Sequence, residues 1–197
     1  MNIMHFNSQR EWGGAENQII ATSRELLRRG HRVSVCCLPG SEMTRRLPVE
    51  NIPFITLDPK SDINLFTIPR IVRLIREHGV DVLNIHSPRY YWIGSIAGKI
   101  AGKPVILTRH VAYRKRGVKR QVNKLLYGIL VDRIVAVSDK IKRELIDDYA
   151  LRDDHVVAIY PGIDLREFEA RAAGSRRDPQ HPVTVGVVSR LAYGKGL

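Results

Sequence analysis

A pair of glycines near the amino terminus is the first feature of the sequence with chemical potential. Gly13 and Gly14 follow a short apolar stretch, residues 3–6, and open a predicted helix that carries Glu16 in its first turn. Glycines at a strand-to-helix junction permit torsions that side chains forbid, and they leave the first helical N–H groups open to an oxygen or phosphate. The pair therefore predicts an anion or sugar cradle. The dinucleotide fingerprint G-x-G-x-x-G is absent, so no NAD site is indicated.

A dense basic stretch occupies residues 109–124. Its seven cationic residues, with no acid among them, are Arg109, Arg114, Lys115, Arg116, Lys119, Arg120 and Lys124. Together with a net charge of +12, they predict attraction to polyanions. Three interpretations remain open: docking to an anionic membrane, recognition of a phosphorylated saccharide, and a solvated basic face. Nucleic acid is not an expected partner, because interleaved aromatic residues are sparse and no nucleic-acid-binding motif is present.

The elements that must position these residues alternate between strand and helix. Predicted strands cover residues 3–6, 32–38, 54–57, 80–86, 104–108, 133–137 and 156–160, and predicted helices cover 15–29, 64–78, 90–101, 118–130 and 139–149. Residues 41–53 are predicted to form a short helix or turn around 43–47 and then a loop with Pro48 and Pro53. Such alternation predicts an α/β fold with a doubly wound, Rossmann-like parallel sheet, whose binding groups lie on loops at the carboxyl ends of the strands. His86 and Ser87 end the fourth predicted strand at that edge.

Composition narrows the class of protein. The sequence is 44% hydrophobic, and it has neither an apolar run long enough to span a membrane nor the basic-then-apolar order of a signal peptide, so a cytoplasmic location is expected. Cys36 and Cys37 are neighbours in a predicted strand and point to opposite faces, so they are expected to be packing residues. No metal site or cofactor is expected, because no Cys/His cluster is present.

Domain organisation follows from a shift in composition. Residues 1–166 are predicted to form one Rossmann-like domain, and 167–182, rich in Ala, Gly, Arg, Asp and Pro, a linker. Residues 183–197 begin a second domain with one apolar strand, 183–188, which cannot bury a core alone. We therefore expect the chain to be part of a longer protein, and this strand to favour self-association.

Five short motifs at the ends of predicted strands carry a family resemblance. They are Gly13-Gly14-Ala15-Glu16, Thr108-Arg109-His110, Val137-Ser138, Tyr160-Pro161-Gly162-Ile163-Asp164, and Ser189-Arg190-Leu191 with Lys195-Gly196. In this order, over nearly the whole chain, they resemble the retaining glycosyltransferases of family 4, which have the two-domain GT-B fold. The chain resembles the N-terminal half of that fold and the start of its second domain. The motif around Arg190 has Ser189 where the family commonly has glycine.

The resemblance implies transfer of a sugar from a nucleotide-sugar to an acceptor, with retained configuration and no metal. The N-terminal domain would hold the acceptor, and Gly13 and Gly14 would lie beside the donor phosphate. Arg190 and Lys195 would clamp the donor diphosphate, where two cations stabilise the charge that develops on the leaving group. His110 matches the histidine near the transferred sugar, the expected catalytic residue.

Acceptor contacts are expected from Glu16, His86, Ser87 and Arg109. The implied acceptor is a glycan or lipid-linked saccharide in bacterial-type polysaccharide or lipopolysaccharide synthesis. Peripheral association with the inner face of the cytoplasmic membrane is the location that corresponds to the membrane-docking interpretation of the basic stretch. The family's paired glutamates lie beyond residue 197, so this chain alone is expected to be inactive. Alternatives are a GT-B-fold sugar-nucleotide epimerase and a basic non-catalytic module that binds glycans or nucleic acid.

Overall fold

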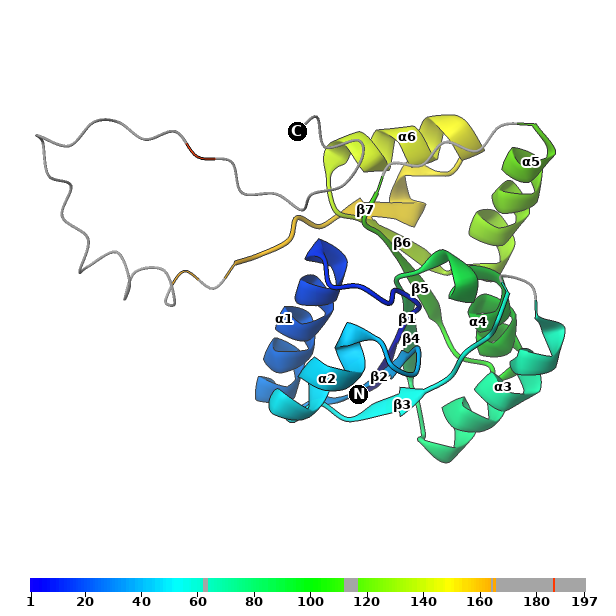
Figure 1. Ribbon diagram of the computed structural model, residues 1–197. Helices are drawn as coiled ribbons and strands as arrows, with labels where there is room; N and C mark the ends of the chain where they lie inside the picture. Colours follow the sequence, from blue (N-terminus) through cyan, green and yellow to red (C-terminus); the bar gives the residue numbers. More distant parts are fainter. Residues whose placement is uncertain (62–63, 112–116, 164, 166–185, 187–197) are drawn as a thin grey trace, which may run out of the picture. The chain divides into compact units, whose positions relative to one another are not determined.

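The computed structural model describes residues 1–61, 64–111, 117–163, 165 and 186. Its centre is a seven-stranded parallel sheet with the order β3-β2-β1-β4-β5-β6-β7 (Figure 1). The strands are β1 (Asn2–Asn7), β2 (Arg32–Cys37), β3 (Phe54–Thr56), β4 (Val82–Ile85), β5 (Val105–Arg109), β6 (Arg133–Ala136) and β7 (Val156–Ala158). The predicted doubly wound Rossmann-like fold is confirmed, with strand boundaries within two residues of those expected.

Helices cover both faces of the sheet (Figure 1). They are α1 (Gly14–Arg28), α2 (Glu42–Val49), α3 (Ile68–Glu77), α4 (Pro88–Ile100), α5 (Val118–Leu125) and α6 (Asp139–Tyr149), with short turns η1 (Leu65–Thr67), η2 (Leu126–Leu130) and η3 (Asp153–His155). A small core joins α1 and α2 to β2 through Ile19, Met43 and Val35. The larger core on the other face joins α3, α4, η2 and α6 to the remaining strands.

Local sequence explains how α3 forms and stops. Its buried residues Ile68, Ile71, Val72 and Ile75 recur at spacings of three and four, which places them on one face of the helix. A proline is tolerated in the first turn, as predicted. Gly79 ends the element with a φ of +57°, a left-handed conformation that glycine adopts without a Cβ clash.

Two glycines let α4 lie close to the sheet. A Cβ atom at Gly94 would lie 2.8 Å from Ile85 Cδ1, and one at Gly98 would lie 2.4 Å from Val105 Cγ2. Only glycine fits these positions without displacing the side chains of Ile85 and Val105. This close packing fixes the amino-terminal end of α4 beside the carboxyl ends of those strands.

The segment predicted as one helix over 118–130 is divided. After α5 the backbone widens into the π-helical turn η2, which buries Leu126 and Tyr127. A π turn adds a residue to the helical repeat and so rotates the side chains that follow it. The apolar row of α5 is instead exposed, with Val118, Val122 and Leu125 at 79%, 41% and 56% exposure.

Met1–Pro161 form one compact unit, and the second unit comprises Gly162–Leu197. The expected linker over 167–182, the strand over 183–188 and its role in self-association fall almost entirely outside the described residues. The division into domains therefore stays a prediction. Within the described ranges, no helix is long and apolar enough to cross a membrane. Cys36 and Cys37 are buried and form no disulfide, as expected.

Candidate functional site

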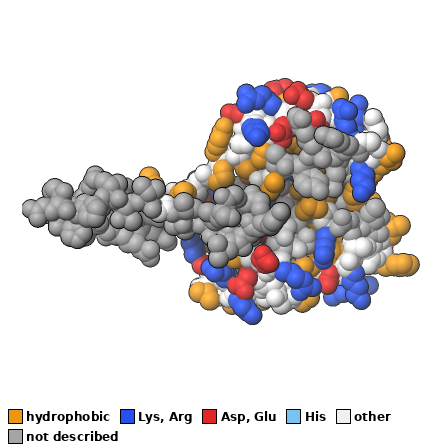
Figure 2. All heavy atoms as spheres, turned by 45° about the horizontal axis from the view of Figure 1, so that its top comes forward, with side chains coloured by type: hydrophobic (Ala, Val, Ile, Leu, Met, Phe, Trp, Pro, Cys, Tyr) orange, Lys and Arg blue, Asp and Glu red, His pale blue; other side chains and the backbone are white. Residues whose placement is uncertain are grey.

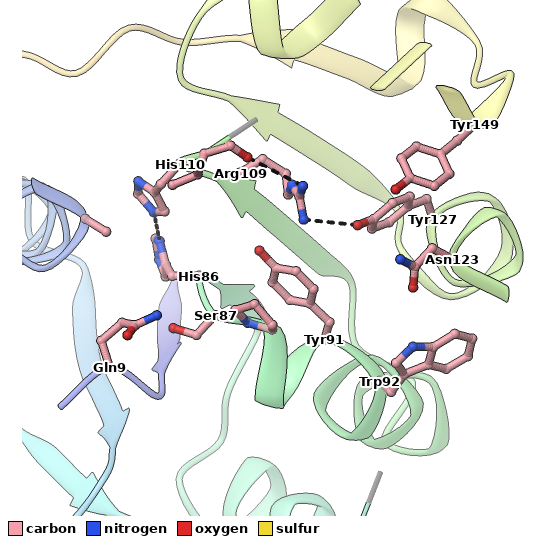
Figure 3. Close-up of a pocket in the computed structure, with 13 residues that line it drawn as sticks. Gln9, His86, Ser87, Tyr91, Trp92, Arg109, His110, Asn123, Tyr127 and Tyr149 are labelled. Carbon is pink, nitrogen blue, oxygen red and sulfur yellow. Dashed lines mark hydrogen bonds between the residues drawn. The ribbon is translucent and has the colours of Figure 1, made fainter. Parts of the chain in front are cut away.

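A pocket of about 480 Å³ lies at the carboxyl ends of the central strands (Figure 3). Its lining includes segments after β1 and β4, between which the strand order turns, and such a turn is the usual ligand position in an open parallel sheet. Segments after β1, β4 and β5 contribute to it, together with α1, α4, α5, η2 and α6. Its lining residues are Gln9, Ala15, His86, Ser87, Pro88, Tyr91, Trp92, Arg109, His110, Val111, Asn123, Tyr127 and Tyr149.

Arg109 is the cation among the described residues that line this pocket. It is the last residue of β5, it is only 8% exposed, and its guanidinium lies among tyrosines (Figure 3). Nη1 donates to the hydroxyl of Tyr127 at 3.2 Å, Nη2 approaches the carbonyl of Val111 at 3.5 Å, and Cζ lies 5.7 Å from the ring centre of Tyr91. Nε is buried without a hydrogen-bond partner in the described structure.

Arg109 also lacks an ion-pair partner among the described residues. Glu144 lines a separate, narrow cavity that Arg109 also borders, and it forms no salt bridge with Arg109. Burial raises the pKa of Tyr91 and of Tyr127, so both hydroxyls stay neutral near pH 7. The pocket therefore contains a buried positive charge that no described side chain neutralises, an arrangement that favours an anionic ligand.

Three histidines form a hydrogen-bonded row that ends in the pocket. His110 Nε2 lies 2.9 Å from His86 Nδ1, and His86 Nε2 lies 2.9 Å from His5 Nδ1. Burial lowers the pKa of His5 and of His110 to about 4. Burial, together with its two histidine neighbours, places the pKa of His86 well below its ordinary value. All three rings are therefore neutral near pH 7.

This row does not form a chelating cluster. The rings bond to one another in sequence, and the described residues contain no group of three or more His, Cys, Asp or Glu that could hold a metal ion. His86 and His110 share a dashed hydrogen bond in Figure 3, between α1 and the end of β5.

Ser87 connects the ends of β1 and β4. Its hydroxyl donates to Asn7 Oδ1 and accepts from the backbone N–H of Ser8 at 2.9 Å. Asn7 Nδ2 in turn donates to Glu16 Oε1 at 3.0 Å. Glu16, expected to contact the acceptor, is 3% exposed, is bonded to Asn7, and is not among the described lining residues. These contacts fix the loop after β1.

The glycine pair has a different structural basis from the one expected. Neither glycine has a positive φ, and Gly13 is extended, at φ −158° and ψ −168°. A Cβ atom at Gly13 would lie 3.1 Å from Glu16 Oε2, so glycine here leaves space for that carboxylate. Gly14 is exposed with open space around it, and Ala15, not the pair, lines the pocket.

The structure thus brings together four of the expected site residues: His86, Ser87, Arg109 and His110. Lys119, Arg120 and Lys124 are exposed on α5, outside the pocket lining. Five other expected residues lie outside the described ones: Arg114, Lys115, Arg116, Arg190 and Lys195. On the face in Figure 2, basic side chains are interspersed with acidic ones instead of forming one patch.

The sequence did not predict His5, Tyr91, Tyr127 and Tyr149 as residues of the site. His5 lies within an apolar strand, and the only available signal was its alternation with Asn7, another polar residue on the same face of β1. Tyr91 follows shortly after Ser87, so its nearness to the pocket could have been inferred. Tyr127 and Tyr149 reach the site through the packing of η2 and α6, which no local motif indicates.

Comparison with known proteins places this geometry in a family. The sequence model described as Glycosyltransferase Family 4 matches residues 12–167. D-inositol 3-phosphate glycosyltransferase from Thermobifida fusca is 26% identical, over 84% of this chain and 44% of that protein.

Two solved structures share the fold. A glycosyltransferase from Rickettsia africae has a TM-score of 0.75 and 22% identity, over 86% of this chain and 45% of that one. Anabaena Alr3699/HepE, solved in complex with UDP and glucose, has a TM-score of 0.72 and 19% identity, over 84% of this chain and 46% of that one. The chain spans less than half the length of each of these proteins. Because the family model matches most of the sequence, this chain belongs to glycosyltransferase family 4.

Proposed function

We propose that the protein containing this chain transfers a sugar from a nucleotide-sugar to a hydroxyl of an acceptor held in the pocket, with retention of configuration. The supporting observation is the pocket itself, which combines the buried cation of Arg109 with the neutral ring of His110 at the carboxyl edge of the sheet. Such a site can orient a polar acceptor while its low polarity strengthens each hydrogen bond.

The acceptor in this proposal bears an anionic group that Arg109 binds. A guanidinium pairs well with phosphate or carboxylate oxygens, and the Nε of Arg109 has no hydrogen-bond partner among the described residues. Two curated relatives, from Thermobifida fusca and Nocardiopsis dassonvillei, carry the name D-inositol 3-phosphate glycosyltransferase, which agrees with a phosphorylated acceptor.

The donor would bind mainly outside the described residues. UDP and UDP-glucose appear with Anabaena Alr3699/HepE, which supports a nucleotide-sugar as the donor class. Arg190 and Lys195 would stabilise the leaving diphosphate as its negative charge grows, without a metal ion. In this proposal the chain of 197 residues alone would not catalyse transfer, because it spans less than half the length of its relatives.

Membrane association is the proposed role of α5. The helix exposes Val118, Val122 and Leu125 along one row, and Lys119 and Lys124 on other faces. An amphipathic basic helix of this kind suits an anionic lipid surface, where a lipid-linked saccharide of cell-surface glycan synthesis would be found.

Vesicle sedimentation tests this role. The double variant Lys119→Glu/Lys124→Glu should lose binding to vesicles that contain anionic phospholipid, with little change on neutral vesicles. Lys140→Glu on α6 is the matched control, because Lys140 is also exposed. Equal binding of the double variant and the control would contradict membrane docking through α5, and insensitivity to salt would contradict an electrostatic contribution.

The reaction itself is tested on the full-length protein with labelled UDP- and GDP-sugars and with phosphorylated and unphosphorylated saccharides. We expect transfer to a phosphorylated acceptor, and an anomeric coupling constant in the product that shows the donor's configuration. Conversion of the nucleotide-sugar into an isomer without any acceptor would identify an epimerase instead. An inverted product would contradict retention.

A further inference from the structure

The histidine row crosses three neighbouring strands. His5 lies within β1, His86 directly follows β4, and His110 directly follows β5, in a sheet where these strands are adjacent. His5 is 1% exposed, whereas His110 is partly exposed and lines the pocket. Successive ring centres are 5.1 Å and 5.2 Å apart. The row thus connects the buried interior beside β1 with the ligand-facing edge of the sheet.

Counting protons restricts the row to two arrangements. A neutral imidazole has one N–H donor and one unprotonated acceptor nitrogen. With both 2.9 Å hydrogen bonds formed, the central ring of His86 must donate one bond and accept the other. Either all three rings are protonated on Nδ1 and donate toward His110, or all three are protonated on Nε2 and donate toward His5.

The buried end of the row distinguishes these arrangements. His5 Nε2 is buried without a hydrogen-bond partner in the described structure. Protonation on Nδ1 throughout leaves only a lone pair unpaired there, whereas protonation on Nε2 leaves a buried N–H without an acceptor. Orphaned N–H groups are the rarer defect in folded proteins, so the Nδ1 arrangement is favoured.

We infer that His5 is a positioning residue that fixes His110 as an Nδ1–H donor. His5 donates to His86, His86 donates to His110 Nε2, and Nδ1–H is the polar group of His110 left for a ligand. The role of this Nδ1–H group in catalysis rests on the proposed function. There, His110 donates a hydrogen bond to an oxygen of the bound sugar or acceptor and does not abstract a proton at Nδ1. His5 contributes without touching the substrate.

Nitrogen NMR of the histidine rings tests this inference without an activity assay. Long-range proton–nitrogen spectra of the labelled chain at pH 7 report which ring nitrogen carries the proton. We expect His110 to be protonated on Nδ1 and not on Nε2. We also expect a scalar coupling across the hydrogen bond between His5 Nδ1 and His86 Nε2, with the proton on the His5 side.

A matched pair of variants tests the role of His5. Asn and Asp both place a polar atom near the position of the histidine Nδ1, but the amide of Asn can donate and an ionised Asp can only accept. His5→Asn should therefore keep His110 protonated on Nδ1. His5→Asp should reverse the row and move the proton of His110 to Nε2. His78→Asn, at an exposed position, is the control and should leave His110 unchanged.

Two results would overturn the inference. One is a wild-type His110 protonated on Nε2. The other is the same His110 tautomer in His5→Asn and His5→Asp. If the Asp variant does not fold, the position of the proton in the wild-type bond between His5 and His86 still decides, because a proton on His86 Nε2 contradicts the proposed direction. None of these results depends on sugar transfer, so they separate this inference from the proposed function.

Discussion

The buried His5 should make the chain less stable in mild acid. Its pKa lies near 4 in the folded state and at 6.5 in the ordinary reference state, because burial disfavours the charged ring. Between these pH values the unfolded chain binds more protons than the folded chain, so stability is fully present above pH 6.5 and is lost as the pH falls toward 4.

The size of this effect follows from the separation of the two pKa values. Each pKa unit corresponds to about 1.4 kcal/mol, so the loss of stability reaches about 3 kcal/mol once the pH lies below both pKa values. Between pH 7 and pH 5 the loss from this residue is about 2 kcal/mol. Asn at this position does not titrate, so His5→Asn should show a loss smaller by about that amount.

Urea denaturation of wild type and His5→Asn at pH 7, 6 and 5 measures the difference. The lowered pKa values of His86 and His110 act in the same direction, and these residues remain in the variant, so some loss persists there. A free energy of unfolding that changes equally with pH in both proteins would refute the reasoning. Histidine titration by NMR is an independent check, since the ring of His5 should remain neutral at pH 5 in the folded wild type.

Two further expectations concern stability. Gly98→Ala should lower the free energy of unfolding by about 1–3 kcal/mol, because the new methyl group would meet Val105 Cγ2 at 2.4 Å. Gly128→Ala is the control and should change the free energy of unfolding little, because Gly128 has open space around it. Equal effects of the two variants in urea denaturation would contradict the close packing of α4. Ser138 caps α6 by accepting from the backbone N–H of Ile141 at 3.3 Å, so Ser138→Ala should lower the melting temperature through a loss of about 1 kcal/mol, and an unchanged melting temperature would argue against the cap.

The fold could be predicted because local signals agreed with tertiary structure. Apolar strands alternated with amphipathic helices, and residues such as Gly79 marked where elements end. The π-helical turn after α5 could not be predicted in the same way. Periodicity continues unbroken through 118–130, and only packing against neighbouring helices determines that Leu126 and Tyr127 are buried while Leu125 is exposed.

Residues of the site could be predicted where a polar side chain directly follows a strand. Ser87 and His110 could be placed because the carboxyl ends of parallel strands share one edge. The prediction that Gly13 and Gly14 adopt torsions forbidden to other residues was wrong, since neither has a positive φ and Gly13 makes room for the buried Glu16. His5 was missed because its partner His86 is 81 residues away along the chain.

The most direct test of the central claim is the acceptor preference of the full-length enzyme. We expect the ratio of kcat/KM for a phosphorylated acceptor to that for its unphosphorylated analogue to fall about tenfold to a hundredfold in Arg109→Met, since a hydrogen bond to a charged group contributes about 1.5–3 kcal/mol. Arg143→Met, at an exposed position on α6, is the matched control and should keep the wild-type ratio. A ratio unchanged in Arg109→Met would contradict the assignment of this pocket to an anionic acceptor.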